Sequence, residues 1–249
     1  MAGTHPLLCG RNLSKRFKGL LAVSDVNIDI HRGEIVGLIG PNGAGKSTTF
    51  NLLSGFLPPT TGRLSLDGVD LTGAAPERIS AHGLVRTFQH GSYLPSMTVA
   101  DNVLIGALGG MRVGRVTRTQ QDEVMREALA LFRLDGQQTR IARNLPHGLQ
   151  RLLSMAIAFA ARPSLICYDE PLTGLNQTEV AETLGVYRRL KGDYGMSMLL
   201  VEHNMRAVMS ICDRIYVLHH GEIIFTGTPD EVKTSEAVLK AYLGEAHDL

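Results

Sequence analysis

The chain has 249 residues, of which 44% are hydrophobic and 20% charged, as in a folded soluble protein with a full core. Its 25 Lys and Arg residues balance 24 Asp and Glu residues, which excludes a bulk field that would recruit nucleic acid or anionic lipid. The longest strongly apolar run, Leu152–Ala161, is about half as long as a bilayer-spanning helix requires. The N-terminus lacks a signal-peptide pattern, so we expect a cytosolic chain. The balanced charge predicts that it has no nucleic-acid partner.

The first third of the chain alternates between strand and turn signals. Short alternating segments occupy residues 7–30, and in residues 26–30 the apolar side chains share one face, which predicts a half-buried antiparallel strand. Residues 34–39 form a continuous apolar run typical of a strand buried on both faces. Further strands are expected at residues 63–68 and 84–89. An antiparallel β layer should therefore surround the turn that follows residue 39.

From residue 98 to residue 161 the pattern becomes helical. Thr98 with Asp101, and Thr119 with Asp122, resemble capping boxes. From residue 163 strands and helices alternate again, with strands expected at 164–168, 197–201, 214–218 and 222–225, a helix extending to about residue 191 and a terminal helix at 234–243. Such alternation predicts a parallel sheet that binds ligands at the carboxyl ends of its strands.

The most informative stretch is residues 34–52, EIVGLIGPNGAGKSTTFNL, which contains the phosphate-binding pattern G-x-x-x-x-G-K-[ST]. Its glycines let backbone N–H groups turn inward around a polyphosphate, Lys46 adds a positive charge, and the Ser47 hydroxyl can ligate Mg²⁺. The nucleotide-binding residues expected from this stretch are Gly40, Asn42, Gly43, Ala44, Gly45, Lys46, Ser47 and Thr48. Kinases, GTPases and motor ATPases share such a loop, so it predicts a P-loop NTPase core but no single activity.

A second sequence, LICYDEP at residues 165–171, narrows the choice. Its apolar residues predict a buried strand that ends at two adjacent carboxylates. Asp169 can hold Mg²⁺ through water, and Glu170 can polarise the attacking water. Consecutive residues at a strand end point in different directions, which lets the pair take two roles.

With these motifs the chain resembles an ATP-binding cassette, the ATPase subunit of ABC transporters, over nearly its whole length. The resemblance implies that Gln89 senses Mg²⁺ and the membrane subunit, and that His203 contacts the γ-phosphate. It implies that Phe17, with Val23 beside it, stacks on adenine, although Phe17 would also suit a hydrophobic core. It assigns catalysis to Lys46, Gln89, Glu170 and His203, and Mg²⁺ binding to Ser47, Gln89 and Asp169.

The family's Leu-Ser-Gly-Gly-Gln signature is altered to LPHGL at residues 145–149. We expect this segment to open a helix from residue 150 to residue 161. In the family, the signature binds the γ-phosphate of ATP held by the opposite subunit, so Pro146, His147 and Gly148 should act in trans. Pro146 removes the serine hydroxyl donor and a backbone N–H.

The C-terminal run that begins at residue 213 looks most like the ATPases of branched-chain amino-acid importers, whose relatives also import amides and urea. We expect one nucleotide-binding domain over residues 1–249, with a catalytic α/β core at 1–89 and 163–249 and a helical subdomain at 90–162. Its partners would be membrane permease subunits, a second ATPase subunit and, indirectly, an extracytoplasmic solute-binding protein. The expected place is the cytoplasmic face of the inner membrane. The alternative is a regulatory or structural partner whose hydrolysis is weakened by the altered signature.

Overall fold

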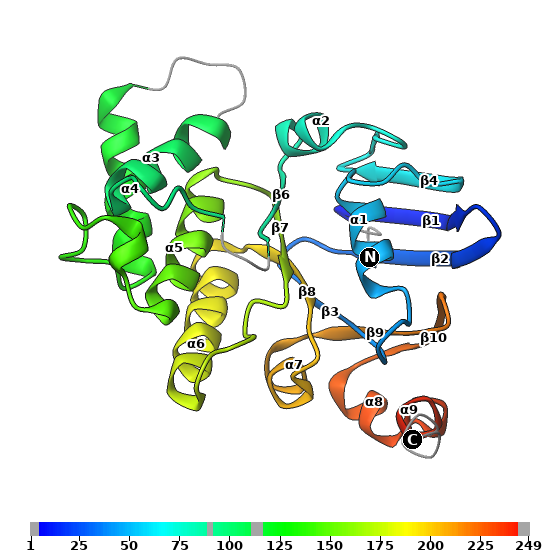
Figure 1. Ribbon diagram of the computed structural model, residues 1–249. Helices are drawn as coiled ribbons and strands as arrows, with labels where there is room; N and C mark the ends of the chain where they lie inside the picture. The colour runs from blue at the N-terminus through cyan, green and yellow to red at the C-terminus, as the bar shows by residue number, and fades with distance from the viewer. Residues whose placement is uncertain (1–4, 89–91, 111–116, 244–249) are drawn as a thin grey trace.

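Two β-sheets form the frame of the molecule, which the computed structural model describes over residues 5–88, 92–110 and 117–243 (Figure 1). The larger sheet contains β3 (Ile35–Ile39), β6 (Leu84–Arg86), β7 (Leu165–Asp169), β8 (Ser197–Val201), β9 (Arg214–His219) and β10 (Glu222–Gly227). The smaller sheet contains β1 (Leu8–Phe17), β2 (Leu20–Ile30), β4 (Thr61–Leu66) and β5 (Val69–Asp70). The helices are α1 (Lys46–Leu53), α2 (Pro76–Ala81), α3 (Val99–Gly110), α4 (Arg118–Leu131), α5 (His147–Ala160), α6 (Gln177–Tyr194), α7 (Met205–Ile211), α8 (Pro229–Thr234) and α9 (Glu236–Leu243).

The order of strands in the larger sheet places several loops at one edge. The order is β10-β9-β3-β8-β7-β6, with parallel pairing from β9 through β6 and antiparallel pairing between β10 and β9. The smaller sheet, ordered β2-β1-β4-β5, is antiparallel. The expected α/β fold with a parallel sheet and an antiparallel layer is confirmed. The loops that follow β3, β6, β7 and β8 therefore share the carboxyl edge of the sheet.

Strand β3 lies between β8 and β9 and is buried along its whole length, as its unbroken apolar sequence predicts. Successive strand residues point to opposite faces, so this sheet contributes to two cores. Ile35 and Ile39 join the core that includes helices α3 to α7, whereas Val36 and Leu38 join the core formed with α1 and the smaller sheet. The sheet is thus covered on both faces, which fixes the position of its loops.

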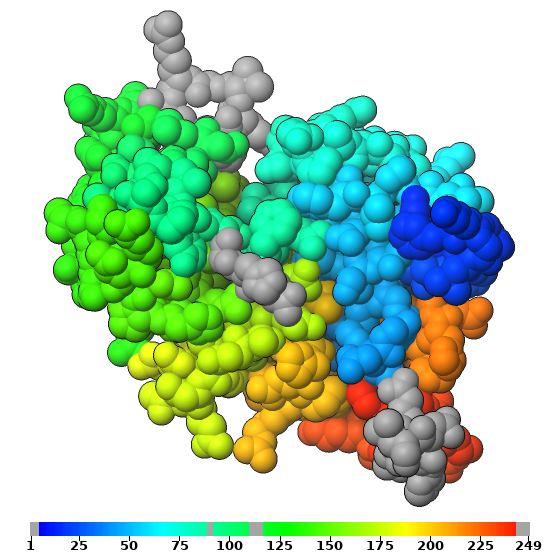
Figure 2. Space-filling model, in the orientation of Figure 1, coloured from blue at the N-terminus to red at the C-terminus, as the bar shows by residue number. Residues whose placement is uncertain are grey.

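Helices α3, α4 and α5 pack on one another beside the larger sheet. Phe132, which directly follows α4, packs against Phe159 of α5, with ring centroids 5.7 Å apart. In Figure 2 these helices, coloured green, form one side of the visible face, and the blue and cyan smaller sheet lies on the other side. The helical character expected between residues 98 and 161 is confirmed.

Two helix starts differ from the expectation. The capping box of α4 consists of Thr117 and Gln120, not Thr119 and Asp122, because the glutamine side chain is long enough to accept the N–H of Thr117 at 3.0 Å. Helix α5 begins at His147, three residues before the expected start, because Pro146 takes the N-cap position, where its missing N–H costs little.

The structure also contains elements that the sequence patterns did not predict. Strand β6 ends at Arg86 rather than at residue 89, and α2 adds a short helix just before it. The terminal helix expected at residues 234–243 is confirmed as α9, and an unpredicted short helix, α8, precedes it across an extended Ser235. Helix α8 had a readable signal, since Thr228 and Glu231 form a reciprocal capping box.

Candidate functional site

The loop between β3 and α1 is shaped by close packing against neighbouring strands. Gly40 and Gly45 have φ values of 155° and 99°, which glycine adopts readily. A Cβ on Gly40 would overlap the carbonyl oxygen of Leu218 in β9, and one on Gly45 would lie 2.8 Å from the carbonyl oxygen of Ala22 in β2. The glycines are therefore needed both for backbone conformation and for space.

Lys46 begins α1 and folds back over the loop. Its Nζ donates hydrogen bonds to the carbonyl oxygens of Gly40 and Pro41, each at 2.6 Å. Helix α1 has no side-chain cap and no acidic residue in its first turn. Its first N–H groups and the Lys46 ammonium thus present positive potential at one place, which suits an anion such as a phosphate.

A cleft of about 620 Å³ opens over this loop. It is lined by residues 42–48, by Phe17, Leu20, Leu21 and Ala22 at the β1–β2 turn, and by Glu170 and His220. Phe17 is 41% exposed, so the alternative of a core phenylalanine does not hold. The cleft offers an apolar wall at one end and a phosphate-type loop at the other.

Val23 does not lie beside Phe17 in this cleft as expected. Its side chain is fully buried in the core beneath the smaller sheet. The pairing of β1 with β2 shifts register between Lys15↔Val23 and Arg16↔Leu21, and the irregularity breaks the alternation of faces near the turn. Leu20, Leu21 and Ala22 line the cleft instead.

The carboxylates predicted after β7 lie at the same sheet edge. Glu170 has φ 46°, a left-handed conformation that costs a non-glycine residue about 1–3 kcal/mol when it is strained. Its backbone N–H donates to the carbonyl oxygen of Val201 in β8 at 2.9 Å. His203, just after β8, approaches it, with Nδ1 3.8 Å from Glu170 Oε2. The structure therefore brings together Glu170 and His203, which are 33 positions apart in the sequence (203 − 170).

Asp169 is the last residue of β7 and pairs with Arg86. The guanidinium Nη2 donates to Asp169 Oδ2 at 2.9 Å, and both side chains are largely buried. Burial raises the pKa of Asp169 above its usual value, and the Arg86 charge opposes this rise. Arg86 was not predicted to contribute to the site, although it lies three residues before Gln89, which was predicted to do so. Gln89 lies outside the described residues.

A second residue that sequence reasoning missed is Glu202, directly before His203. Its side chain is nearly inaccessible, with 2% of the residue exposed. Oε1 accepts the N–H of Leu172 at 2.8 Å, and Oε2 accepts the N–H groups of His203 at 3.2 Å and Asn204 at 3.4 Å. Burial raises the pKa of Glu202, and these backbone N–H groups oppose the rise. The carboxylate joins the loop after β7 to the loop after β8.

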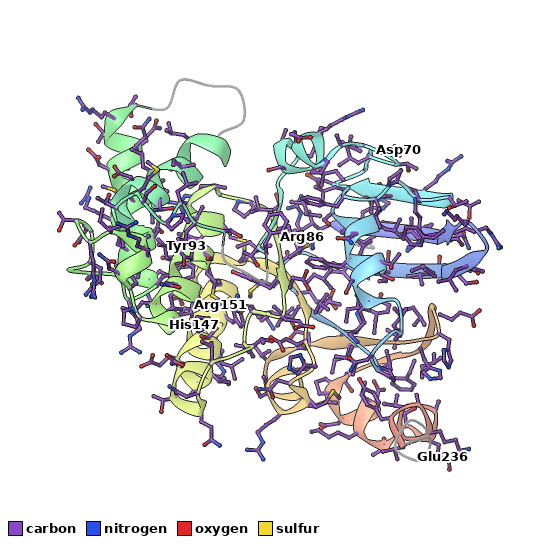
Figure 3. The ribbon with its side chains drawn as sticks, in the orientation of Figure 1. Asp70, Arg86, Tyr93, His147, Arg151 and Glu236 are labelled. Atoms are coloured by element: carbon purple, nitrogen blue, oxygen red, sulfur yellow. The ribbon has the colours of Figure 1, made fainter. Side chains whose placement is uncertain are left out.

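The altered signature forms a separate part of the surface. Pro146 is the N-cap of α5, and His147 and Gly148 are its first residues, so their N–H groups lie at the helix N-terminus. Gly148 lines a small hollow of about 140 Å³ together with Glu179 of α6, whereas none of residues 146–148 is among those lining the cleft over residues 42–48. Within one chain, the structure does not bring the signature to the phosphate-type loop. Figure 3 shows His147 with Arg151 at this end of α5.

The residues at the sheet edge fit a nucleotide with Mg²⁺. The turn before α1 and the first N–H groups of that helix suit a polyphosphate, as described above. The Ser47 hydroxyl and the Asp169 carboxylate supply hard oxygen donors, and Mg²⁺ is usually held by one or two such protein ligands together with substrate phosphates.

The described residues contain no helix long and apolar enough to cross a membrane.

Known proteins share both this sequence and this fold. A family model described as ABC transporter matches residues 23–173, and one described as Branched-chain amino acid ATP-binding cassette transporter matches residues 222–248. The high-affinity branched-chain amino acid transport ATP-binding proteins LivG of Escherichia coli strain K12 and BraF of Pseudomonas aeruginosa are 39% and 37% identical, each over 98% of this chain and 100% of its own length. The crystal structure of MJ1267, an ATP-binding cassette of an ABC transporter in its ADP conformation, aligns with a TM-score of 0.84 and 29% identity, covering 97% of this chain and 100% of that one.

The chain belongs to the ABC transporter family. Within that family it is the ATP-binding cassette, the chain that binds and hydrolyses ATP, and its C-terminal segment is of the branched-chain amino-acid type.

Proposed function

We propose that this chain powers the uptake of branched-chain amino acids, or of a related small polar solute such as an amide or urea, through separate membrane permease subunits. The observation that carries the proposal is the meeting of the glycine loop, Asp169, Glu170 and His203 at the carboxyl edge of one parallel sheet. The names of LivG and BraF, together with the C-terminal family match, support the transported solute.

In the proposed site, each residue acts on one part of ATP. Phe17 stacks on the adenine, while Lys46 and the N–H groups of residues 42–48 neutralise and orient the phosphates. The hydroxyl of Ser47 and the carboxylate of Asp169 hold Mg²⁺ with Gln89, and bound Mg²⁺ neutralises charge on the transferred phosphate.

Hydrolysis then needs a base and a contact to the transferred γ-phosphate, with ADP as the leaving group. Glu170 lines the cleft, so its carboxylate is placed to take a proton from an attacking water. His203 approaches Glu170 and is placed to contact the γ-phosphate and orient that carboxylate. Both side chains come from strand ends that the sheet holds fixed, which preorganises them.

The signature supports an assembly of two cassettes. Because residues 146–148 lie apart from the chain's own phosphate loop, we propose that they bind ATP held by a second ATPase subunit, identical or different. The further partners are the permease subunits and, indirectly, an extracytoplasmic solute-binding protein, and the chain would lie on the cytoplasmic face of the inner membrane. We also propose that residues 90–162 act as a helical subdomain beside the catalytic core at 1–89 and 163–249.

The test is the variant Lys46→Ala, assayed in the complex with the permease. We expect nucleotide affinity to fall and phosphate release to be abolished, because each hydrogen bond from a charged donor contributes about 1.5–3 kcal/mol. The matched control is Lys233→Ala, which removes an exposed lysine on α8 that pairs with Asp230. Near-parental turnover by Lys46→Ala would refute the proposed site. A parent complex that binds ATP but never hydrolyses it would instead favour the regulatory alternative.

A further inference from the structure

Arg86 occupies an unusual position for a charged residue. It ends β6, its side chain is only 12% exposed, and its guanidinium lies between the strand that carries Asp169 and helix α1 (Figure 3). Nη2 donates to Asp169 Oδ2, and Nη1 donates to Asn51 Oδ1 and to Ser54 Oγ, the latter at 3.2 Å. One planar group thus bonds to two different elements at the same time.

Aromatic rings enclose the same guanidinium. Its Cζ lies 4.4 Å from the ring centroid of Phe50, 4.8 Å from that of Phe56 and 5.2 Å from that of Phe88. Cation–π contacts of this kind favour arginine over lysine, and the rings restrict the rotamers that the side chain can adopt. Arg86 is therefore held in place, and it holds its polar partners in place in turn.

One partner of Arg86 is a proposed metal ligand, and another lies one helical turn from a second proposed ligand. Asn51 follows Ser47 by four residues on α1, so the two side chains lie on the same helix face. Asp169 is itself a proposed ligand, and Gln89 follows Arg86 by three residues in the chain. The two proposed Mg²⁺ ligands that the structure describes are therefore connected to one guanidinium, Asp169 by a direct hydrogen bond and Ser47 through one turn of α1.

We propose that Arg86 is a positioning residue that sets the separation of Ser47 and Asp169 and thereby the affinity of the nucleotide site for Mg²⁺. The inference rests on the proposed function, because it assumes that these two residues hold the metal. A rival physical effect has the opposite sign: the Arg86 charge repels a cation bound at Asp169, so removing it would tighten metal binding. The positioning effect is expected to win, because partners that orient metal ligands change metal affinity or activity by about 10–100-fold when lost.

The experiment measures metal binding rather than turnover. Mn²⁺ is titrated into the chain with a non-hydrolysable ATP analogue and followed by electron paramagnetic resonance, and nucleotide affinity is measured separately in EDTA. For Arg86→Met we expect a loss of metal affinity of about 10-fold or more, with metal-free nucleotide affinity within about twofold of the parent, since Arg86 does not line the cleft. Arg86→Lys should recover only part of the loss, because an ammonium lacks the planar fork.

Two further variants keep the test decisive. Arg78→Met makes the same substitution at an exposed position on α2 and should leave both affinities unchanged. Asn51→Ala removes one partner of the guanidinium while leaving Arg86 and Asp169 in place, so it should give a smaller loss of metal affinity in the same direction. This variant carries the test if Arg86→Met does not fold. Unchanged or tighter metal binding in Arg86→Met, or in Asn51→Ala where only that variant folds, would overturn the inference. A parent chain without metal-dependent nucleotide binding would overturn the proposed function itself.

Discussion

The most informative perturbation is at Gly148, because two different explanations for a glycine apply there. In the family resemblance, the residue lies against a nucleotide held by the partner subunit, where a side chain would block the approach. In the structure, a Cβ at this position would also lie 2.9 Å from Cδ of Glu179 in the same chain. A substitution such as Gly148→Asp cannot separate these explanations, since its carboxylate would meet Glu179 as well as a phosphate.

The energetic size of the second explanation can be worked out from the contacts of Glu179. This side chain accepts the N–H of Asn176 at 2.9 Å and completes the capping box of α6, and a methyl group at residue 148 would displace it. Loss of a full helix cap costs about 0.5–2 kcal/mol, and because Asn176 still accepts the N–H of Glu179 here, the cost lies toward the lower end of that range. Against this, replacing glycine by alanine within a helix gains at most about 1 kcal/mol. With the full gain of about 1 kcal/mol, Gly148→Ala should change the free energy of unfolding by between about 0.5 kcal/mol in the stabilising direction and about 1 kcal/mol in the destabilising direction.

A double-mutant cycle separates the two explanations. In a Glu179→Ala background the obstructing carboxylate is gone, so Gly148→Ala should become stabilising, with a coupling of about 0.5–2 kcal/mol measured by urea unfolding. We expect Gly148→Ala to abolish ATP turnover in the permease complex. The double variant should not recover it, because in the proposed assembly the methyl group still faces the partner's nucleotide. Equal effects of Gly148→Ala in both backgrounds would refute the packing argument. Recovery of turnover along with stability would refute the role of Gly148 in trans.

Two other predictions concern the carboxylate edge and the buried thiols. Glu170→Gln should bind ATP and Mg²⁺ without hydrolysis, because the amide keeps the shape of the carboxylate but not its basicity. It should accumulate as a two-chain species in light scattering. A persistent monomer, even with a candidate second cassette present, would contradict this prediction. Burial raises the pKa of Cys167 to about 12 and also raises that of Cys212 and, less completely buried, Cys9. A raised thiol pKa leaves less thiolate at a given pH. Iodoacetamide at pH 8 should therefore label Cys9 first and Cys167 only on unfolding, as followed by peptide mass spectrometry. Rapid labelling of Cys167 in the folded chain would show that β7 opens readily.

Local patterns were sufficient to predict the frame of the protein. Strand β3 has an uninterrupted apolar sequence because both of its faces are buried, and that signal does not depend on any distant residue. The glycine loop could also be read directly, since its residue pattern spans fewer than nine positions, whereas its packing against Leu218 and Ala22 could not. Helix boundaries were harder to predict from the sequence, because Pro146 suits the position just before a helix as well as a turn.

The links between loops could not be predicted from local patterns. Arg86 and its partner Asp169 are 83 positions apart, and Glu202 and Leu172 are 30 positions apart. Neither the strand sequence LVR nor the sequence VEH contains a sign of these partners. They are found only when the parallel pairing of β6, β7 and β8 brings the ends of the three strands to one edge. The missed residues therefore share a physical cause, which is that their hydrogen bonds join separate strands.

These two buried charges also constrain how the loops at the sheet edge can rearrange. Glu202 binds the N–H groups of Leu172, His203 and Asn204, so a shift of the loop after β7 must either lengthen the bond to Leu172 or carry His203 with it. Losing a hydrogen bond to a charged group costs about 1.5–3 kcal/mol, whereas moving both partners together preserves the contact. The same reasoning applies to Arg86, whose bonds connect α1 to Asp169. Concerted displacement of these loops is therefore less costly than displacement of any one of them, and the proposed metal ligands and the proposed γ-phosphate contact should rearrange together.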